Sequence, residues 1–582
     1  MTQILGISCY YHDSAACLYR DGRPVAAVSE ERFTRKKHDD SFPTRAIEYC
    51  LAAGGIEAKD LDCIGFYDKP IRKFERILAT TISTFPRGLR AFWRAIPVWL
   101  HEKLWVPRRI VKKLGYPKTK PILFTDHHES HAASAFLVSP FEEAAIISID
   151  GVGEWATATY GVGRGTDIEI QAEMRFPHSL GLFYSAFTYY CGFKINSGEY
   201  KLMGLAPYGE PKYVDRILEH LLDLKEDGSF QLHMDYFTYQ YGTTTIGPRF
   251  ERLFGAKSRK PGEPLTQFHM DVAASAQKVT EEAILGMARH VHEKTGLTRL
   301  CMAGGVALNC VANGRIIRET PFKDLFVQPA AGDAGGALGV AAFIYHSLLK
   351  NPREYVMNDA YLGPAYSTEQ AETYLKRIGV PYRKLDRPEL LSTCARLIAE
   401  GNVVGWFQGR MEFGPRALGS RSILADPRQP TMKDLVNEKI KLREGFRPFA
   451  PTVTSERAND WFELDVPSPF MLLCAPVREG RTSLPAITHV DRSARIQTVS
   501  GEQNALYHDL IEEFERQTGC AVILNTSFNI RGEPIVLDPE QAFRCFMRTD
   551  MDHLLVDSFH LDKKEMPPAQ QVIGAFEEFP LD

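Results

Sequence analysis

The sequence predicts an α/β protein of two domains, and three observations lead to this expectation. The chain has 582 residues, more than one hydrophobic core usually supports. Segments that alternate like strands are interspersed with segments of 3.6-residue periodicity, the pattern of a mixed α/β fold. Around residues 351–364 the chain turns polar and rich in proline and asparagine. We therefore expect a first domain at 1–355 and a second at 356–582.

The first domain contains two copies of one strand pattern. Residues 4–32 read as a strand, a polar turn, a second strand, an Asp-Gly hairpin turn and a third strand. Residues 144–175 repeat this order, with a turn at 150–153 and a second, glycine-rich turn. Two such meanders, each followed by helices, are similar in pattern to the actin-like architecture of sugar kinases and heat-shock ATPases, in which a nucleotide lies between the halves. The sequence thus predicts a duplicated ATPase-type domain.

Two histidines precede the second copy of the pattern. His127 and His131 are four residues apart, and the alanines that follow favour a helix, so both imidazoles would project from one helical face. Asp150 ends a short apolar strand, and Asp333 lies in a glycine-rich turn. Two imidazoles and two carboxylates can hold a divalent metal ion and leave coordination positions open. The alternative is that the histidines cap a helix or lie at the surface.

The polar turn of the first copy contains a candidate general base. His12 has an unperturbed pKa near neutrality, which suits proton abstraction, although a turn histidine with only a hydrogen-bonding role fits the spacing equally well. A basic cluster with Arg32, Arg35, Lys36 and Lys37 follows the third strand. Such a cluster is usually a solvated face, but its place after the first meander also suits a phosphate.

Two glycine-rich turns between a strand and a helix come later in the first domain. Gly304 and Gly305 end a strand, Asn309 begins the next helix, and residues 332–336 form the second turn. Backbone amides at a helix amino terminus favour anions, so we expect a nucleotide to pass close to these turns. Gly151, in the turn after Asp150, is a further candidate for this contact.

Residues 176–211 combine many aromatic rings and glycines with a few charged groups. This composition is typical of a pocket wall, in which Glu199 or Lys201 would orient a polar substrate. The alternative is that the rings belong to the core and the glycines to turns.

Composition excludes some classes of partner. The formal net charge of −4 argues against a broad basic field for nucleic acid. The most apolar long segment, residues 89–106, is interrupted by charged residues and is not a membrane span; its tryptophans, Trp93, Trp99 and Trp105, suggest an amphipathic insertion over a groove. The 11 cysteines form no CxxC pair, and residues 1–19 lack the basic region and the small-residue cleavage site expected of a signal peptide. We expect a cytoplasmic protein with neither a nucleic-acid nor a membrane partner.

The second domain concentrates cations in a few segments. Arginines lie among glycines and a proline in residues 409–421, and basic residues follow in 439–447. This pattern implies a small, strongly anionic ligand held by guanidinium groups and completed by hydroxyl and amide groups near residues 525–529. A surface of ordinary salt bridges is the alternative. The residues concerned are Arg410, Arg416, Arg421, Lys439, Lys441, Arg443, Arg447, Arg495, Asn525, Ser527 and Asn529.

These segments together resemble one family. The matching motifs are HDSAA, EERFTRKKHD, DHHESHAAS, SIDGVGEW, GEYKLMGLAPYG, AGGVALN, GDAGGALG, GRMEFGPRALGSRSI, SARIQTV and NTSFN, and they span nearly the whole chain. The set resembles the NodU and TobZ family of O-carbamoyltransferases. The resemblance implies a TsaD-like domain, similar to the one that transfers threonylcarbamoyl to tRNA, with an insertion near 70–120, followed by a YrdC-like domain.

The resemblance also implies a reaction in two steps. The YrdC-like domain would convert carbamoyl phosphate and ATP, with Mg²⁺, into carbamoyl adenylate and pyrophosphate, and the larger domain would pass the carbamoyl group to an alcohol and leave AMP. His127, His131, Asp150 and Asp333 would hold a divalent metal, iron in the family, and His12 would be the base. The nucleotide and carbamoyl phosphate would contact Lys37, Arg416, Lys441, Arg447, Arg495, Asn525 and Ser527.

The acceptor is expected to be a small hydroxylated natural product, selected by walls in residues 71–116 and 176–200. Two other functions are open at this point: a threonylcarbamoyl transferase acting on tRNA, and a non-catalytic nucleotide binder of the actin-like class. The sequence shows no basic stripe for tRNA, and a nucleotide binder leaves the arginines unexplained. The sequence permits a homo-oligomer.

Overall fold

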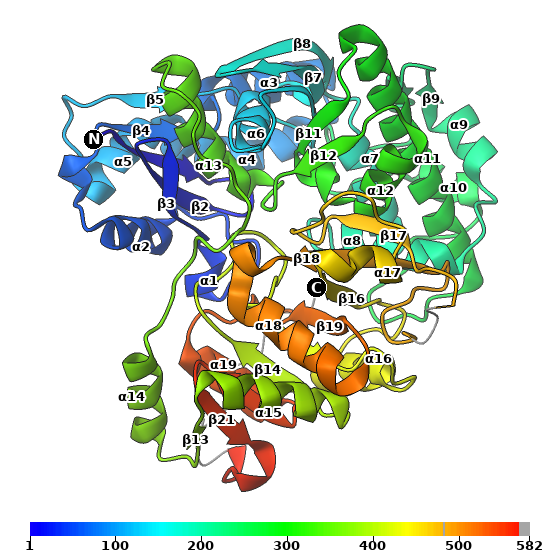
Figure 1. Cartoon of the computed structure of the whole chain (residues 1–582). Coiled ribbons are helices and arrows are strands. Elements are labelled where there is room, and N and C mark those ends of the chain that lie inside the picture. The colour runs from blue at the N-terminus through cyan, green and yellow to red at the C-terminus, as the bar shows by residue number, and fades with distance from the viewer. Residues whose placement is uncertain (481–483, 570–582) are drawn as a thin grey trace. The chain divides into compact units, whose positions relative to one another are not determined.

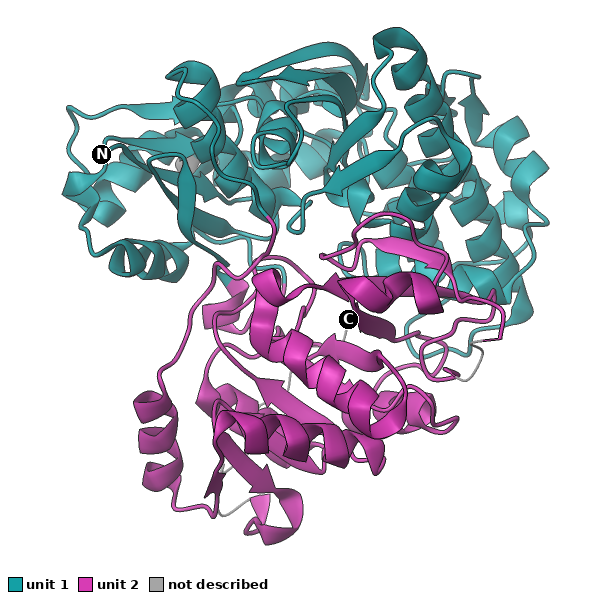
Figure 2. Cartoon of the chain, viewed as in Figure 1, with its two compact units in different colours: residues 1–30, 38–357 teal, residues 31–37, 358–582 magenta. Residues whose placement is uncertain are grey.

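The computed structural model describes residues 1–480 and 484–569 and divides into two compact units (Figure 2). Unit 1 comprises Met1–Glu30 and His38–Met357, and unit 2 comprises Glu31–Lys37 and Asn358–Asp582. No pattern in the sequence predicts that residues 31–37 cluster with unit 2 while the chain on either side of them belongs to unit 1.

Unit 1 contains two five-stranded sheets. The first is built from β1 (Gln3–Ser8), β2 (Ala15–Arg20), β3 (Arg23–Ser29), β4 (Cys63–Phe66) and β5 (Ile122–Phe124). The second is built from β6 (Glu143–Ile149), β7 (Ala156–Arg164), β8 (Asp167–Arg175), β11 (Arg299–Ala303) and β12 (Asp324–Val327). Their strand orders are β3-β2-β1-β4-β5 and β12-β11-β6-β7-β8 (Figure 1). Each is therefore an antiparallel meander whose first strand pairs with a parallel strand, and the predicted duplication is confirmed.

Helices of unit 1 connect and cover these sheets. Their bounds are α2 (Thr44–Gly54), α3 (Pro70–Ser83), α4 (Leu89–His101), η2 (Lys103–Trp105), α5 (Val106–Leu114), α6 (His127–Phe136), α7 (Leu180–Tyr190), α8 (Glu199–Leu205), α9 (Val214–His220), α10 (Pro248–Phe254), α11 (Gln267–Thr295), η4 (Gly305–Leu308), α12 (Cys310–Glu319), α13 (Asp333–Ala342) and the π-helix η5 (Phe343–Leu348). A two-stranded sheet of β9 (Leu222–Leu224) and β10 (Phe230–Leu232) lies between α9 and α10 in the sequence.

The glycines of α13 allow close packing. A Cβ atom on Gly339 would lie 1.9 Å from the carbonyl oxygen of Ser130 in α6, and one on Gly336 would lie 2.8 Å from the ring of Tyr67. Similarly, a Cβ on Gly6 of β1 would lie 1.8 Å from the carbonyl oxygen of Ala337. Only glycine permits these approaches. The small residues after Asp333 thus bring the amino terminus of α13 against the two histidines of α6.

Several rings of α7 belong to the core, so the pocket interpretation of residues 176–211 is wrong for these rings. Phe183, Phe187 and Tyr190 of α7 are fully buried. The ring centroids of Phe183 and Phe187 lie 5.0 Å apart, and Phe187 lies 5.2 Å from Phe250 in α10. Glu199 accepts a hydrogen bond from Ser185 Oγ at 2.8 Å.

Unit 2 is built on a nine-stranded mixed sheet of order β13-β21-β20-β14-β15-β19-β16-β18-β17 (Figure 1). The strands are β13 (Arg383–Lys384), β14 (Val404–Phe407), β15 (Arg421–Ala425), β16 (Ala450–Thr454), β17 (Leu473–Pro476), β18 (Ser493–Val499), β19 (Val522–Ser527), β20 (His553–Val556) and β21 (Phe559–Asp562). The helices are α1 (Glu31–Thr34), α14 (Thr368–Ile378), α15 (Arg387–Ala399), α16 (Met432–Leu435), η6 (Val436–Ile440), α17 (Ala458–Trp461), α18 (Gly501–Thr518) and α19 (Pro539–Arg548).

The segment Glu31–Lys37 is fastened into unit 2 by its arginines. Arg32 is 4% exposed and donates to the carbonyl of Gly414 at 2.9 Å. Arg35 donates to the carbonyls of Pro534 and Ile535 and pairs with Glu533 at 3.0 Å. Neither arginine belongs to a solvated face or is available to a phosphate, so both interpretations of the basic cluster are wrong for this pair.

All eleven cysteines are buried, and none forms a disulfide. Within the part of the chain that the structure describes, no helix has the length and apolar character needed to cross a bilayer.

Candidate functional site

Four side chains that are far apart in the sequence meet in unit 1. His127, His131, Asp150 and Asp333 are buried, and each offers one donor atom within 4.8 Å of the others. His127 Nε2 lies 3.1 Å from His131 Nε2 and 2.9 Å from Asp150 Oδ2. It lies 3.6 Å from Asp333 Oδ1, a buried oxygen that has no hydrogen-bond partner. Two imidazole nitrogens and two carboxylate oxygens around one point fit a divalent metal ion.

Neighbouring groups hold each carboxylate so that one oxygen faces the cluster. The Gly305 amide donates to Asp150 Oδ1 at 3.0 Å, which leaves Oδ2 toward the histidines. The Tyr67 hydroxyl donates to Asp333 Oδ2 at 3.4 Å. The helix that presents the histidines is fixed in turn by Glu154, which accepts from the His127 amide at 3.0 Å. Such outer contacts orient metal ligands.

The electrostatics of the cluster favour a neutral His127 beside an ionised Asp150. Burial, together with the charge of Lys73, holds the pKa of His127 well below its usual range. Burial opposes ionisation of Asp150, but hydrogen bonds from His127 and His131 outweigh it and keep the pKa of Asp150 well below its usual value. Burial raises the pKa of Asp333 to about 6. Neutral histidine nitrogens have the lone pairs that metal coordination needs.

His12 belongs to a hydrogen-bonded chain of two histidines and one carboxylate. Its Nδ1 lies 3.0 Å from Asp13 Oδ2, and the other oxygen of Asp13 lies 2.8 Å from His38 Nδ1. Burial would lower the pKa of His12, but the charges of Asp333, Asp13 and Asp150 raise it to about 10. The imidazole therefore holds a proton at neutral pH for as long as those carboxylates keep their full charge.

The predicted nucleotide-binding residues of unit 1 lie next to the cluster and make internal contacts. Gly304 has a φ of +89°, and a Cβ there would lie 2.2 Å from the Ile149 carbonyl, so this glycine is required for packing. The Gly305 amide is used by Asp150, and Asn309 caps α12 and exchanges two hydrogen bonds with Gln277. Gly151 follows Asp150 directly. Nucleotide binding by these residues stays a prediction.

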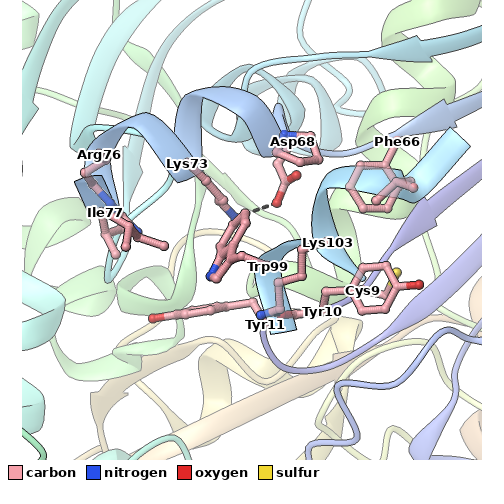
Figure 3. Close-up of a pocket in the computed structure, with 13 residues that line it drawn as sticks. Cys9, Tyr10, Tyr11, Phe66, Asp68, Lys73, Arg76, Ile77, Trp99 and Lys103 are labelled. Carbon is pink, nitrogen blue, oxygen red and sulfur yellow. Dashed lines mark hydrogen bonds and ion pairs between the residues drawn. The ribbon is translucent and has the colours of Figure 1, made fainter. Parts of the chain in front are cut away.

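Unit 1 contains a cavity of about 170 Å³, and Figure 3 shows the residues that line it. Its wall is partly the predicted insertion, with Trp99 from α4 and Lys103 from η2. Lys73 of α3 forms an ion pair with Asp68 and lies 5.2 Å from the centre of the Tyr67 ring, and Tyr67 reaches Asp333. Contacts through Tyr67 thus link the wall of the cavity to the cluster. The remaining lining residues are Cys9, Tyr10, Tyr11, Phe66, Pro70, Arg76, Ile77, Val106 and Val152.

In unit 2, the central strands place the predicted polar residues on one face of the sheet. Asn525 of β19 donates to Gln497 Oε1 of β18 at 2.9 Å and to Thr452 Oγ1 of β16 at 3.2 Å. Because side chains alternate along a strand, Arg495 shares the face of Gln497, and Ser527 shares the face of Asn525. The buried Oδ1 of Asn525 and Nε of Arg495 have no hydrogen-bond partner, so this face presents unsatisfied polar atoms.

Lys441 joins the same end of β19. Its side chain is buried, and Nζ donates to Ser527 Oγ at 3.2 Å and to Asn529 Oδ1 at 2.6 Å. Burial, with the charge of Arg443, holds the pKa of Lys441 well below its usual range. Arg447 follows on the same loop, 3.8 Å from Glu444. A bound anion would favour the charged form of Lys441.

The glycine-rich loop 409–421 is shaped by one carboxylate that the sequence analysis missed. Glu412 Oε1 accepts the amides of Leu418 and Ser420 at 2.8 Å each and that of Arg421 at 3.2 Å. Asn525 donates to the Ala417 carbonyl at 3.3 Å, which places the loop of Arg416 beside the sheet face.

Two arginines of this loop are structural, which corrects their assignment to a ligand. Arg421 is fully buried and donates to the carbonyls of Gln408, Gly409, Ser420 and Pro364, and its guanidinium lies 3.7 Å from the centre of the Phe407 ring. Arg410 donates to the carbonyls of Leu362 and Gly363. Lys37, predicted to contact nucleotide, lies half-buried in the segment that clusters with unit 2.

Comparisons with known proteins are consistent along the chain. The family model for the carbamoyltransferase N-terminus matches residues 3–342, and that for the carbamoyltransferase C-terminus matches residues 395–563. An uncharacterized protein of Synechocystis sp. is 56% identical over all of both chains. Nodulation protein NolNO of Sinorhizobium fredii is 41% identical over 96% of this chain and 80% of its own length.

More distant matches were also found. A 3'-hydroxymethylcephem-O-carbamoyltransferase of Amycolatopsis lactamdurans is 33% identical over 58% of this chain and 59% of its own length. The crystal structure of T. kodakarensis HypF aligns with 60% of this chain and 48% of its own, at 14% identity and a TM-score of 0.30, which is too low to support an inference. The two family models and the relatives agree with the resemblance found in the sequence motifs. The chain belongs to the carbamoyltransferase family.

Proposed function

We propose that the protein is an O-carbamoyltransferase that makes carbamoyl adenylate in unit 2 and transfers the carbamoyl group to a hydroxyl in unit 1. The observation that carries this proposal is the buried cluster of His127, His131, Asp150 and Asp333, in a chain that belongs to the carbamoyltransferase family. The predicted YrdC-like character of unit 2 is part of the proposal.

The polar sheet face of unit 2 supports the adenylate-forming step. Arg416, Lys441, Arg447 and Arg495 would bind the phosphates of ATP and carbamoyl phosphate, with Mg²⁺ on ATP. Atom balance requires one water, which converts the donor to carbamate and phosphate before a carbamate oxygen displaces pyrophosphate from the α-phosphorus of ATP. Asn525 and Ser527 offer amide and hydroxyl groups for the small planar carbamoyl unit.

In the transfer step, the acceptor oxygen attacks the carbamoyl carbon and AMP leaves. His12 would take the proton of the hydroxyl at its Nε2, since Nδ1 is held by Asp13. This role requires a neutral imidazole, whereas the charges of Asp333 and Asp150 raise the pKa of His12 to about 10. A divalent metal, iron by family resemblance, held by His127, His131, Asp150 and Asp333, would supply Lewis acidity and neutralise those charges.

The cavity in unit 1 supports a small acceptor. At about 170 Å³ it is smaller than the pockets that enclose drug-sized ligands. Trp99 and Tyr11 offer ring faces, while Arg76 and Lys103 add positive charge; Lys73 is balanced by Asp68 (Figure 3). We infer a hydroxylated acceptor of about monosaccharide size, with neutral or acidic rather than cationic substituents near this wall.

The test is pyrophosphate release from ATP that depends on carbamoyl phosphate, followed by mass spectrometry of a panel of hydroxylated metabolites. His12→Asn should lose carbamoyl transfer and keep pyrophosphate release, while Arg495→Ala should lose both. If the rate of pyrophosphate release does not depend on carbamoyl phosphate, the proposal is refuted. A threonylcarbamoyl transferase for tRNA is not favoured, since the relatives found include a carbamoyltransferase for a small cephem.

A further inference from the structure

The helical insertion of unit 1, residues 70–114, combines exposed apolar side chains with a strong positive charge. Eight of the fifteen large apolar side chains that are exposed among the described residues lie between residues 71 and 105. These eight are Ile71, Ile82, Phe85, Leu89, Trp93, Val98, Leu100 and Trp105. Soluble proteins rarely leave so many apolar groups together at the surface without a partner.

The outward face of α4 shows the combination most clearly. Exposed positions recur one turn apart, at Leu89 and Arg90, then Trp93 and Arg94, then Val98. Residues four apart share a helix face, so Leu89 and Trp93 form one row, and Arg90, Arg94 and Val98 form the row beside it. Trp93 is 66% exposed, whereas Trp99 on the inward face is 9% exposed and lines the cavity.

The charge of the insertion is opposite in sign to that of the chain. Residues 70–114 contain eleven lysines and arginines and two glutamates, a net charge of +9, while the whole chain has −4. No acidic side chain among the described residues pairs with Arg90, Arg94 or Arg108. These cations are therefore available to an external anionic surface.

We propose that the insertion 70–114 docks on the surface of a bilayer that contains anionic lipids. Aromatic and aliphatic side chains beside arginines are the composition of interfacial segments, which bury apolar groups at the headgroup boundary while cations meet anionic lipids. A second copy of the same patch would meet it with like charge. A nucleic acid would leave Ile71, Ile82 and Leu100 without a stacking role. The proposal departs from the expectation of no membrane partner, which considered only spanning segments, and it does not depend on the proposed function.

The test is sedimentation of the full chain with vesicles of phosphatidylcholine alone and with vesicles that contain 30 mol% phosphatidylglycerol. We expect binding to the anionic vesicles only, weakened by salt. The double variant Arg90→Gln/Arg94→Gln should bind about 30-fold more weakly, from two cations near the surface. Trp93→Ser should weaken binding about tenfold by removing a partly buried ring.

Two control variants remove the same kinds of side chain, cationic and apolar, outside residues 70–114. Lys257→Gln/Lys260→Gln removes two exposed charges outside the insertion, and Leu348→Ser/Leu349→Ser removes two half-exposed leucines; both should bind like the unaltered protein. All variants are first checked for an unchanged unfolding temperature. Binding to neither vesicle, equal binding to both, concentration-dependent self-association through this patch, or preference for a single-stranded oligonucleotide would each overturn the proposal.

Discussion

Removing one donor from the four-residue cluster should abolish metal binding without unfolding unit 1. In His131→Gln the imidazole Nε2 that lies 3.1 Å from His127 Nε2 is replaced by an amide, a poor ligand. His128→Gln is the matched control. His128 is the neighbouring buried histidine of α6, but its Nδ1 lies 3.1 Å from Thr159 Oγ1, and it is not a member of the cluster.

The size of the effect follows from linkage. A ligand at 100 times its Kd stabilises the folded state by about 2.7 kcal/mol. Unit 1 has about 350 residues, so its unfolding entropy is about 0.7 kcal/mol per kelvin, and the metal should raise its Tm by about 4 °C. His131→Gln should lose this increment, and His128→Gln should retain it.

The assay is scanning calorimetry of the purified protein with a chelator and with an excess of Fe²⁺ or Mn²⁺, together with metal analysis. We expect one metal per chain in the unaltered protein and in His128→Gln, and less than one tenth of that in His131→Gln. If His131→Gln keeps both the metal and the increment in Tm, or if both variants lose them equally, the assignment of the cluster as a metal site is wrong.

Contacts of Glu412, Lys73 and His12 lead to three further predictions. Glu412→Gln replaces three charge-assisted hydrogen bonds by neutral ones of about half their strength. The free energy of unfolding of unit 2, measured with denaturant, should therefore fall by about 2–4 kcal/mol, and most of the pyrophosphate release should be lost. A fall of less than about 0.5 kcal/mol would contradict the role of Glu412. Lys73→Met leaves the buried Asp68 unpaired and should lower the free energy of unfolding of unit 1 by about 3–5 kcal/mol. Adding Asp68→Asn should restore most of the lost stability. If stability is not restored, the broken ion pair is not the cause of the destabilisation. In metal-free protein the pKa of His12 is raised to about 10, so protonation of His12 stabilises unit 1 fully below pH 6.5, and this stabilisation is lost as the pH rises through 10. The unfolding temperatures of the unaltered protein and of His12→Asn should therefore converge at high pH. A constant difference between the two unfolding temperatures across this pH range would be inconsistent with the raised pKa.

Local patterns were sufficient to predict the strands and the metal candidates. The alternation in residues 4–32 and 144–175 and the Asp-Gly turn at Asp21 predict the two meanders because side-chain alternation and turn chemistry are properties of neighbouring residues. The spacing of His127 and His131 placed both on one helix for the same reason. Only its glycine-rich turn makes Asp333 a candidate, and its place in the cluster depends on how closely α13 packs on α6.

Contacts between distant segments could not be predicted in this way. Nothing near Arg32 or Arg35 indicates that they bind carbonyls about 380 and 500 residues away. The small residues around Arg421 suggest a ligand-binding arginine, whereas two of them, Gly409 and Ser420, supply backbone carbonyls that it binds. The raised pKa of His12 likewise depends on carboxylates from three separate segments.

The short segment Glu31–Lys37 limits how this chain can be divided. Phe33 packs against Met411, Ile535 and Leu537, so a side chain from residues 31–37 completes an apolar cluster whose other members lie more than 370 residues later in the chain. A truncated product that starts at Asn358 would lack Phe33 and the neighbouring Arg32 and Arg35. It would therefore expose apolar surface and tend to aggregate. To prepare unit 2 by itself, residues 31–37 should therefore be supplied as a separate peptide or joined to residues 358–582 through a linker.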